Sequence, residues 1–311
     1  MSAGGGKKAI VAALSANLGI AIAKFIGAAI TGSGSMLAEA VHSVADTGNQ
    51  GLLLLGQNRA EQEADELHPF GYARNRYFYS FVVALVLFTL GAMYAIYEGV
   101  HKIQHPEDLS SPFVAVAILV IASALESYSF WTAMRESAPL RGNAGWWRFI
   151  RNSRNPELPV VLLEDSGALI GLLIALVAVV LTMVTGNPIF DGLGTLAIGL
   201  LLGVIAVVLI VEMKSLLIGE GATPDQNRRI RENLVDGTRI DRVIHLRTEY
   251  LGPEELLVAA KVAIVPGLDI ADIARAIDDA EARVRAAVPA AGLMYIEPDL
   301  YRSPATTESS R

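Results

Sequence analysis

The stretch PVVLLEDSGALIGLLIALVAVVLTMVT, residues 159–185, decides the class of fold to which this chain belongs. Its only charged residues are Glu164 and Asp165, which lie near its start. A hydrocarbon core about 30 Å thick requires roughly 20 predominantly apolar residues of helix, so this stretch predicts a membrane-spanning helix. A charged side chain at the centre of a bilayer costs about 2.5–3.5 kcal/mol, and carboxylates kept inside a span are therefore candidates for function.

The composition of the whole chain also indicates an α-helical membrane protein. Hydrophobic residues make up 52% of the sequence and charged residues 18%, and the mean hydropathy is positive, as is typical of membrane proteins. Long apolar runs stop at Lys214, whereas charged residues recur every few positions from Ser215 onward. We therefore expect a transmembrane domain over residues 1–214 and a small cytosolic α/β domain over residues 215–302.

Six apolar segments are candidates for membrane-spanning helices: residues 9–30, 36–57, 76–101, 112–134, 159–185 and 190–213. The first is too long for the core of a signal peptide, so we interpret it as a span. Six spans place both termini on one side, and basic residues favour the cytosolic side. The side of the termini carries Lys7, Lys8, Arg59, Arg74, Arg76, Arg135, Arg141, Arg148, Arg151, Arg154 and Lys214, whereas the other carries only Lys102. Both termini are therefore expected in the cytosol.

The C-terminal region shows the pattern of a two-layer α/β domain. Its expected elements are a helix opened by the capping residues Thr223-Pro-Asp-Gln226, strands at 243–250 and 256–265, a helix at 270–287 and a strand at 294–297,. The order is αββαβ, with a sheet covered on one side by helices. Residues 303–311 are small and polar, and we expect them to be disordered.

Several classes of function are excluded by the composition. Basic residues form no patch with interleaved aromatic residues, so nucleic acid is not an expected partner. The chain has no cysteine, and any bound metal must therefore use His, Asp or Glu,. An intramembrane enzyme is disfavoured because there is no His-Glu-x-x-His motif, no Gly-x-Ser-x-Gly motif and no cysteine nucleophile,.

The second predicted span is the richest in polar residues and reads Leu37-Ala-Glu39-Ala-Val-His42-Ser-Val-Ala-Asp46. One helical turn separates His42 from Asp46, so both point the same way and form half of a metal site. Glu164 and Asp165 could supply the other half, since Zn²⁺ takes four nitrogen or oxygen ligands. The alternative is that His42 hydrogen-bonds a neighbour and Asp46 pairs with Lys24. For Glu39, near the end of its helix, a solvated or gating role and ligation both stay open.

At these residues the sequence resembles the cation diffusion facilitator family, whose second span carries a Leu-Ala-Asp-Ala-x-His-Ser-x-x-Asp type of motif. The resemblance extends to the six spans, to the cytosolic stretch Asp65-x-x-His68-Pro-Phe-Gly71-Tyr72 and to the αββαβ tail, which is similar to the family's ferredoxin-like regulatory and dimerisation domain. It implies a homodimer that exports Zn²⁺ or a related divalent cation in exchange for protons. Its partners would be metal ions, protons, membrane lipid and a second copy of the chain.

The resemblance also implies a set of ligands for the transported metal. His42 and Asp46 match the ligand pair of the second span, and Asp165 matches the later ligand of the fifth. The earlier ligand of the fifth span falls on Val161, which cannot bind a metal. The motif Leu163-Glu164-Asp165 is similar to the branch that includes the mitochondrial zinc transporter of animals. Zinc is therefore the expected cargo, with iron, manganese, cobalt and cadmium as alternatives, and no resident cofactor is expected.

The ligand that replaces Val161 is expected to be Glu164 or a water molecule. Glu126, in the fourth span, is expected near the site or on a proton path; alternatively, it only hydrogen-bonds Ser or Tyr hydroxyls between helices. Glu39 is a second candidate for the proton path. The metal and the protons would compete for the same ligand atoms, and His42 would carry the proton because its unperturbed pKa is about 6.5.

Two further groups of residues are weaker candidates for metal binding. Asp65 and His68 match the family's cytosolic loop site, whose third ligand, often a His, falls on Tyr72; a neutral phenol is a poor ligand, so we expect an incomplete site with an electrostatic or structural role. In the tail, His245, Glu297 and Asp299 are the only plausible metal contacts, and ordinary surface polar groups are the alternative. A metal-regulated channel or a metal sensor is the alternative function. The expected location is the plasma (inner) membrane of a bacterium.

Overall fold

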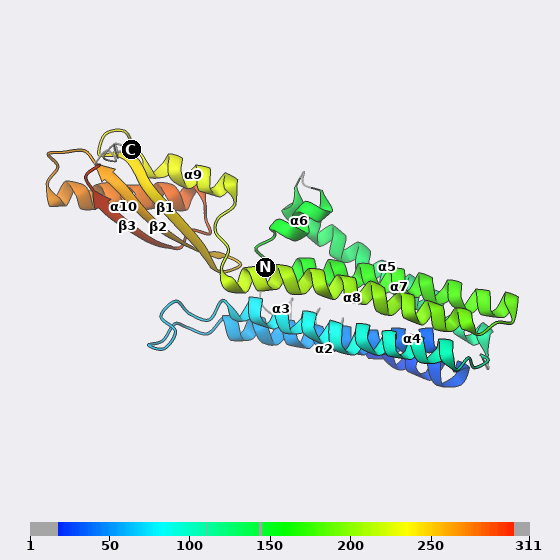
Figure 1. The fold of residues 1–311 in the computed structure, drawn as a ribbon. Coiled ribbons are helices and arrows are strands. Elements are labelled where there is room, and N and C mark those ends of the chain that lie inside the picture. Colours follow the sequence, from blue (N-terminus) through cyan, green and yellow to red (C-terminus); the bar gives the residue numbers. More distant parts are fainter. Residues whose placement is uncertain (1–17, 110, 143–144, 302–311) are drawn as a thin grey trace, which may run out of the picture. The chain divides into compact units, whose positions relative to one another are not determined.

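The computed structural model describes residues 18–109, 111–142 and 145–301 of the 311-residue chain. The chain forms two compact units that divide between Ser215 and Leu216: a helical unit and a unit with a three-stranded sheet (Figure 1). The start of the predicted first span, with Lys7 and Lys8, and the predicted disordered tail at 303–311 lie outside the described residues.

The helical unit consists of long helices joined by short connections. A helix at Leu18–Thr31 comes first. It is followed by α2 Gly34–Ala60, α3 Asn75–Val86, η1 Leu87–Met93, α4 Tyr94–Gln104, α5 Pro112–Arg141, α6 Trp146–Asn152, α7 Glu157–Thr185 and α8 Ile189–Ile218. The π-helical segment η1 continues α3 into α4 without a break, so that the three form one helix from Asn75 to Gln104.

Four helices in the described part of the chain are long and apolar enough to cross a membrane, namely Asn75–Gln104, Pro112–Arg135, Glu157–Thr185 and Ile189–Ile218. They coincide with the last four of the six predicted spans. The helix α2 is long, but it carries the polar run between Glu39 and Gln50, and the first helix is shorter within the described residues. The protein is therefore a helical membrane-type protein with a small C-terminal sheet.

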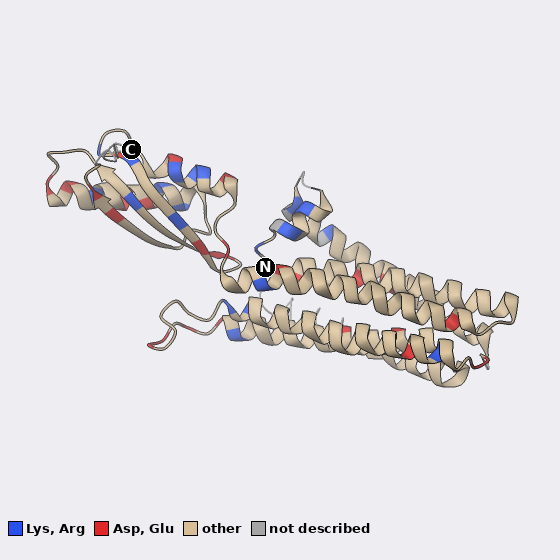
Figure 2. Cartoon of the chain, viewed as in Figure 1, with Lys and Arg blue, Asp and Glu red and all other residues tan. Residues whose placement is uncertain are grey.

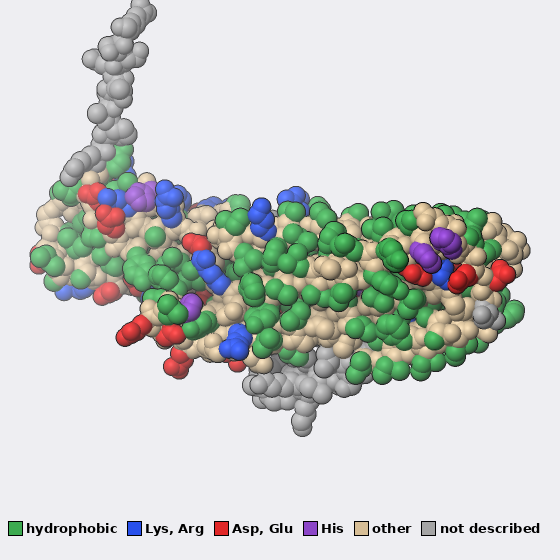
Figure 3. All heavy atoms as spheres, turned by 60° about the horizontal axis from the view of Figure 1, so that its bottom comes forward, with side chains coloured by type: hydrophobic (Ala, Val, Ile, Leu, Met, Phe, Trp, Pro, Cys, Tyr) green, Lys and Arg blue, Asp and Glu red, His purple; other side chains and the backbone are tan. Residues whose placement is uncertain are grey.

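The surface of the helical unit is apolar, as the lipid-facing side of a membrane protein must be. Figure 3 shows hydrophobic side chains over most of the visible face of its helices. Large hydrophobic residues such as Leu173 and Val184 of α7 and Val204 of α8 are more than half exposed. Figure 2 shows few charges along these helices and many in the C-terminal unit. An exposed apolar surface of this extent would promote aggregation in water, so it indicates contact with lipid.

The start of α2 is fixed by Asp191 in the first turn of α8. The Asp191 carboxylate accepts hydrogen bonds from the hydroxyl of Ser33 at 2.7 Å, the backbone N–H of Gly34 at 2.7 Å and the hydroxyl of Ser35 at 2.6 Å. Ser33 also caps α2 by accepting from the backbone N–H of Met36. A carboxylate at a helix N-terminus satisfies free N–H groups and complements the helix dipole. This contact sets the position of α2 and thereby of its polar residues.

Two glycines let α4 and α8 approach closely. A Cβ atom on Gly99 of α4 would lie 2.5 Å from the backbone nitrogen of Leu196, and one on Gly199 of α8 would lie 2.6 Å from that of Ile96. Elsewhere α5 packs on α7, and α2 packs on α3 and α7. The polar faces of α2, α5 and α7 are thereby brought together inside the unit.

The C-terminal unit contains α9 Pro224–Leu234, β1 Ile240–Gly252, β2 Glu255–Ile264, α10 Ile270–Ala287 and β3 Leu293–Asp299. The sheet order is β1-β2-β3, with β1 antiparallel and β3 parallel to β2. Buried side chains of both helices and of the strands form one core, which includes Ile230 and Leu234 of α9, Val258 and Val262 of β2, and Ala280 and Val284 of α10. Both helices therefore contribute to one core against the sheet.

Candidate functional site

The polar residues of α2 form one stripe along the helix. Glu39, His42, Asp46 and Asn49 are spaced three or four residues apart and therefore lie on one face,. Glu39, His42 and Asn49 are fully buried, and Asp46 is largely buried. Since α2 packs on α7, this stripe faces the inside of the helical unit rather than lipid.

His42 and Asp46 lie together with free ligand atoms. The Nδ1 atom of His42 is 3.5 Å from Oδ1 of Asp46. Among the described residues, neither ring nitrogen of His42 nor Oδ1 of Asp46 has a hydrogen-bond partner. Buried polar atoms in proteins are nearly always hydrogen-bonded, and exceptions require an explanation. A cation bound between these atoms would explain why they have no hydrogen-bond partner.

The two acidic residues of α7 point to different neighbours. Asp165 accepts a hydrogen bond of 3.2 Å from the hydroxyl of Ser129 on α5, and it interacts electrostatically with Asp46 and Glu126. Glu164 is buried and accepts a short hydrogen bond from the side-chain amide of Asn49 on α2. Successive helical residues point about 100° apart, which accounts for the difference.

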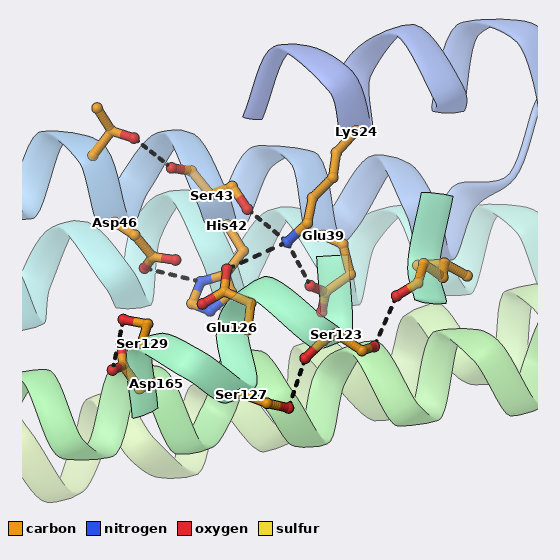
Figure 4. Close-up of polar contacts among 12 residues, drawn as sticks. Lys24, Glu39, His42, Ser43, Asp46, Ser123, Glu126, Ser127, Ser129 and Asp165 are labelled. Carbon is orange, nitrogen blue, oxygen red and sulfur yellow. Dashed lines mark hydrogen bonds and ion pairs between the residues drawn. The ribbon is translucent and has the colours of Figure 1, made fainter. Parts of the chain in front are cut away.

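Lys24, from the helix Leu18–Thr31, brings a positive charge to this group (Figure 4). Its ammonium donates to the hydroxyl of Ser43 at 2.7 Å and to Oε2 of Glu39 at 3.4 Å, and it lies 3.9 Å from Oε1 of Glu126 on α5. The ion pairs of Lys24 are thus with two glutamates rather than with Asp46, the partner considered from the sequence. Glu39 is fully buried against Lys24, so the solvated role considered for it is not what the structure shows.

The structure does not gather three predicted ligands around one point. In the described part of the chain, no group of three or more His, Asp and Glu side chains lies close enough to hold a metal ion. His42 and Asp46 form a pair, and Asp165 lies across from them on α7 (Figure 4). Binding one ion through all three requires these side chains or their helices to move closer together.

The cytosolic loop residues Asp65 and His68 are in contact with Tyr72 rather than with further ligands. The phenol of Tyr72 donates a hydrogen bond of 2.7 Å to Asp65, and the His68 ring packs on the Tyr72 ring with centroids 4.4 Å apart. Nδ1 of His68 lies 3.5 Å from Asp65. The hydrogen bond from Tyr72, followed by that from the backbone of His68, lowers the pKa of the Asp65 carboxyl. These contacts close the turn that leads into α3.

In the C-terminal unit, a lysine lies between the three candidate residues. His245 on β1 pairs in register with Lys261 on β2, and Lys261 pairs with Glu297 on β3. The Lys261 ammonium lies 2.9 Å from Glu297 and 3.0 Å from Asp299, and these carboxylates raise the pKa of Lys261. Both carboxylates already have a cation as partner, so they are poor candidates for a metal.

Sequence reasoning did not identify the partners that hold the acidic residues. Ser129 and Asn49, which bind Asp165 and Glu164, lie on other helices, and helical periodicity within one span cannot pair residues of different spans,. The available signal was Lys24, the only charged residue described in the helix Leu18–Thr31. A lysine in an apolar helix requires an acidic partner, but several carboxylates were candidates.

Comparison with known proteins identifies relatives over most of the chain. The profile of the cation efflux transmembrane domain matches residues 10–218. The mouse protein named proton-coupled zinc antiporter SLC30A9, mitochondrial, is 35% identical over 242 residues, which are 77% of this chain and 42% of the mouse protein. The chain thus spans less than half the length of that relative.

Two more distant relatives come from a plant and a bacterium. Metal tolerance protein C4 of Arabidopsis thaliana is 29% identical over 258 residues, which cover 82% of this chain and 56% of the plant protein. Magnetosome protein MamB of Paramagnetospirillum magneticum is 22% identical over 302 residues, 96% of this chain and 94% of the bacterial protein. The similarity to the bacterial protein therefore runs through both units.

Proposed function

Because the chain belongs to the cation efflux family, we propose that it is a divalent metal transporter, specifically a zinc/proton antiporter that exports Zn²⁺ from the cytosol. The names of the mouse relative, a proton-coupled zinc antiporter, and of the plant relative, a metal tolerance protein, support this activity. The residues present fit a metal of borderline softness, because imidazole and carboxylate are its common ligands and the chain has no thiolate,.

The observation that carries the proposal is the unpartnered state of buried ligand atoms on α2. Both ring nitrogens of His42 and one carboxylate oxygen of Asp46 lack hydrogen bonds among the described residues, and Asp165 lies opposite on α7. We propose that these three residues bind the transported ion. The position of Val161 cannot contribute, which leaves the fourth place to another carboxylate or to water.

Exchange with protons follows from the chemistry of these ligands. A metal binds to neutral imidazole and ionised carboxylate, so metal and protons compete for the same atoms. His42 would release a proton when metal loads from the cytosol and take one up on the other side. No separate coupling site is required for antiport.

The proposal includes an architecture. Six spans, with the helix Leu18–Thr31 and α2 as the first two, would place both termini in the cytosol, and the αββαβ tail would be a ferredoxin-like domain that supports a homodimer. The similarity to family members over residues 10–218 supports the span count. A bacterial relative matched over nearly its whole length supports a bacterial membrane as the location, and we propose the plasma (inner) membrane.

The test is metal transport by purified protein in vesicles. Zn²⁺, Fe²⁺, Mn²⁺, Co²⁺ and Cd²⁺ are offered with and without a pH gradient, to the wild type and to Asp46→Ala. We expect saturable Zn²⁺ uptake that drives proton movement in the opposite direction and that Asp46→Ala abolishes. The matched control is Glu107→Ala, which removes an exposed carboxylate far along the sequence from α2.

The same experiment separates an antiporter from its rivals. A channel would conduct without saturation and without moving protons against the metal. A sensor would bind metal without sustained flux. Full transport by the Asp46→Ala protein would contradict the assignment of the site.

A further inference from the structure

Lys24 is a buried charge that the proposed transport mechanism does not use. Its side chain is fully buried in a membrane-type helix, where a charged group is costly unless it is paired and has a role. Its ammonium contacts Ser43 at 2.7 Å, Glu39 at 3.4 Å and Glu126 at 3.9 Å. One lysine thus serves two carboxylates, and Glu39 alone would suffice to neutralise it.

The two carboxylates are not held equally. Lys24 donates a long hydrogen bond of 3.4 Å to Glu39, whereas its 3.9 Å contact with Glu126 is an ion pair without a hydrogen bond. Glu39 is fully buried, whereas the Glu126 side chain is 12% exposed. Glu126 is therefore the carboxylate that can leave Lys24, while the ammonium keeps its hydrogen bonds to Glu39 and Ser43.

Glu126 also lies beside the proposed ligands. It interacts electrostatically with His42, Asp46 and Asp165, one after another across α2 and α7. Figure 4 shows the Glu126 carboxylate beside the His42 ring and joined by a dashed line to the Lys24 ammonium. Binding of the ion by Glu126 requires this side chain to turn from Lys24 toward the unpartnered nitrogens of His42.

The rival for the fourth position is less free to move. Glu164 interacts with Asp46 and Asp165, but its Oε1 atom accepts the short hydrogen bond from Asn49, farther along α2 than Asp46. This bond anchors the Glu164 carboxylate beside Asn49 and limits how far it can turn toward the ion; breaking it would leave the buried Asn49 amide without an acceptor, which is unfavourable,. Moving Glu126 breaks no hydrogen bond of the described residues.

We propose that Glu126 of α5 is the exchangeable fourth ligand of the transport site, held in the metal-free protein by Lys24, which acts as an internal cation that the metal displaces. This rests on the proposed transport function. The site then has one imidazole and three carboxylates from three helices. Lys24 is a positioning residue: it prevents mutual repulsion of the carboxylates when the metal has left, and it competes with the metal for Glu126.

The test uses Co²⁺ as a spectroscopic probe of the ligands in the purified full-length protein, with Zn²⁺ transport measured in vesicles. Glu126→Gln should change the Co²⁺ absorption spectrum and weaken Co²⁺ binding about tenfold or more, the scale on which even supporting residues alter metal affinity. Glu164→Gln should keep the wild-type spectrum. The reverse result, an altered spectrum only in Glu164→Gln, would overturn the proposal, as would two unaltered spectra.

Lys24 is tested by removing its charge. Lys24→Met should bind Co²⁺ more tightly and lower the KM for Zn²⁺ while also lowering kcat, because metal would leave more slowly without the returning ammonium; Lys24→Arg should restore both values toward wild type. A purely structural role predicts weaker binding or no change, and either result contradicts the proposal. Where Lys24→Met does not fold, Lys24→Met/Glu39→Gln removes one charge of each sign and tests the same step.

Asp46→Ala keeps the two proposals distinguishable. If this variant loses Co²⁺ binding while Glu126→Gln does not, the transport site stands and the role of Glu126 fails. If Asp46→Ala binds Co²⁺ with the wild-type spectrum, the transport site itself is misplaced and both proposals fail.

Discussion

At the scale of single residues, the chemistry of this protein depends on which partner each buried polar atom has. Asp165 and Glu164 are adjacent in the sequence, yet one is bound by Ser129 of α5 and the other by Asn49 of α2. The two ring nitrogens of His42 have no hydrogen-bond partner among the described residues. Binding capacity therefore resides in the atoms left free, and counting carboxylates in a span does not reveal it.

The same reasoning applies to the loop before α3. Its third ligand position is occupied, but by Tyr72, whose side chain is a poor metal ligand. The Tyr72 ring lies on the His68 ring, and its hydroxyl reaches Asp65. Tyr72→His would replace a poor ligand by an imidazole next to a His and an Asp. We predict that the wild-type loop has no tight zinc site and that Tyr72→His adds one equivalent of bound Zn²⁺, measured by titration calorimetry.

A second change identifies the loop as the place of binding. Adding His68→Ala to Tyr72→His should remove the new equivalent, whereas His68→Ala alone should leave zinc binding as in the wild type. Tight binding at the wild-type loop that His68→Ala abolishes would show that the site is already complete. Because the pKa of Asp65 is lowered, its hydrogen bond with Tyr72 persists at neutral pH and is lost only as the pH falls through that lowered pKa,.

At the scale of elements, the sequence predicts the ends of individual helices correctly, but it does not predict which side chains of different helices contact each other. The helix expected at 270–287 is α10, because Asp269 caps it by accepting from the backbone of Asp272. The capping box of Thr223 and Gln226 is present at α9. By contrast, the pairing of Lys24 with Glu39 and Glu126, and the π-helical turns of η1, depend on packing between helices. Periodicity within one segment contains no information on such packing.

The contact of Asp191 with the start of α2 is the element-scale feature with the clearest energetic consequence. Asp191→Ala leaves the hydroxyls of Ser33 and Ser35 and the N–H of Gly34 without their shared acceptor. A buried donor that loses its partner costs about 1–3 kcal/mol. We predict that Asp191→Ala in detergent has a clearly lower midpoint of thermal unfolding than the wild type. Unfolding is monitored by intrinsic fluorescence.

The control for this change is a carboxylate that makes no such contact. Glu107 is exposed in the connection after α4, and Glu107→Ala should keep the wild-type midpoint. Equal midpoints for Asp191→Ala and the wild type would mean that the start of α2 is held by other contacts. Asp191→Asn should lie in between, because the amide keeps one acceptor but loses the charge.

At the scale of the whole molecule, the sequence predicts one region in lipid and one in water. The structure has two compact units that divide between Ser215 and Leu216. Four of the six predicted spans are helices that meet the length and apolarity of a span among the described residues. The other two spans stay predictions. The helix Leu18–Thr31 is short within the described residues, and α2 is polar because it carries the residues proposed to bind metal. The polar residues that lower the hydropathy of α2 are thus the same residues that are candidates for its function.

The number of spans has a direct test, because the natural chain contains no cysteine. A single introduced cysteine is then the only thiol that a membrane-impermeant maleimide can modify. With six spans, Glu63→Cys in the loop before α3 and Glu254→Cys in the turn between β1 and β2 lie on the cytosolic side, and Glu107→Cys lies outside. All three positions are exposed in the structure.

We predict that intact cells label Glu107→Cys at once, whereas Glu63→Cys and Glu254→Cys label only after permeabilisation. These three positions do not separate six spans from four, because a chain that crossed only with the last four helices would place them on the same sides. The decisive position is the connection between the helix Leu18–Thr31 and α2, which lies outside only if both of these helices cross the membrane. Ser33 is buried against Asp191, so the cysteine is placed at Gly32, which is exposed but whose φ of 68° strains any side chain. Labelling of Gly32→Cys from outside, together with protection of Glu63→Cys, places α2 across the membrane, and labelling of both from the same side would rule out six spans.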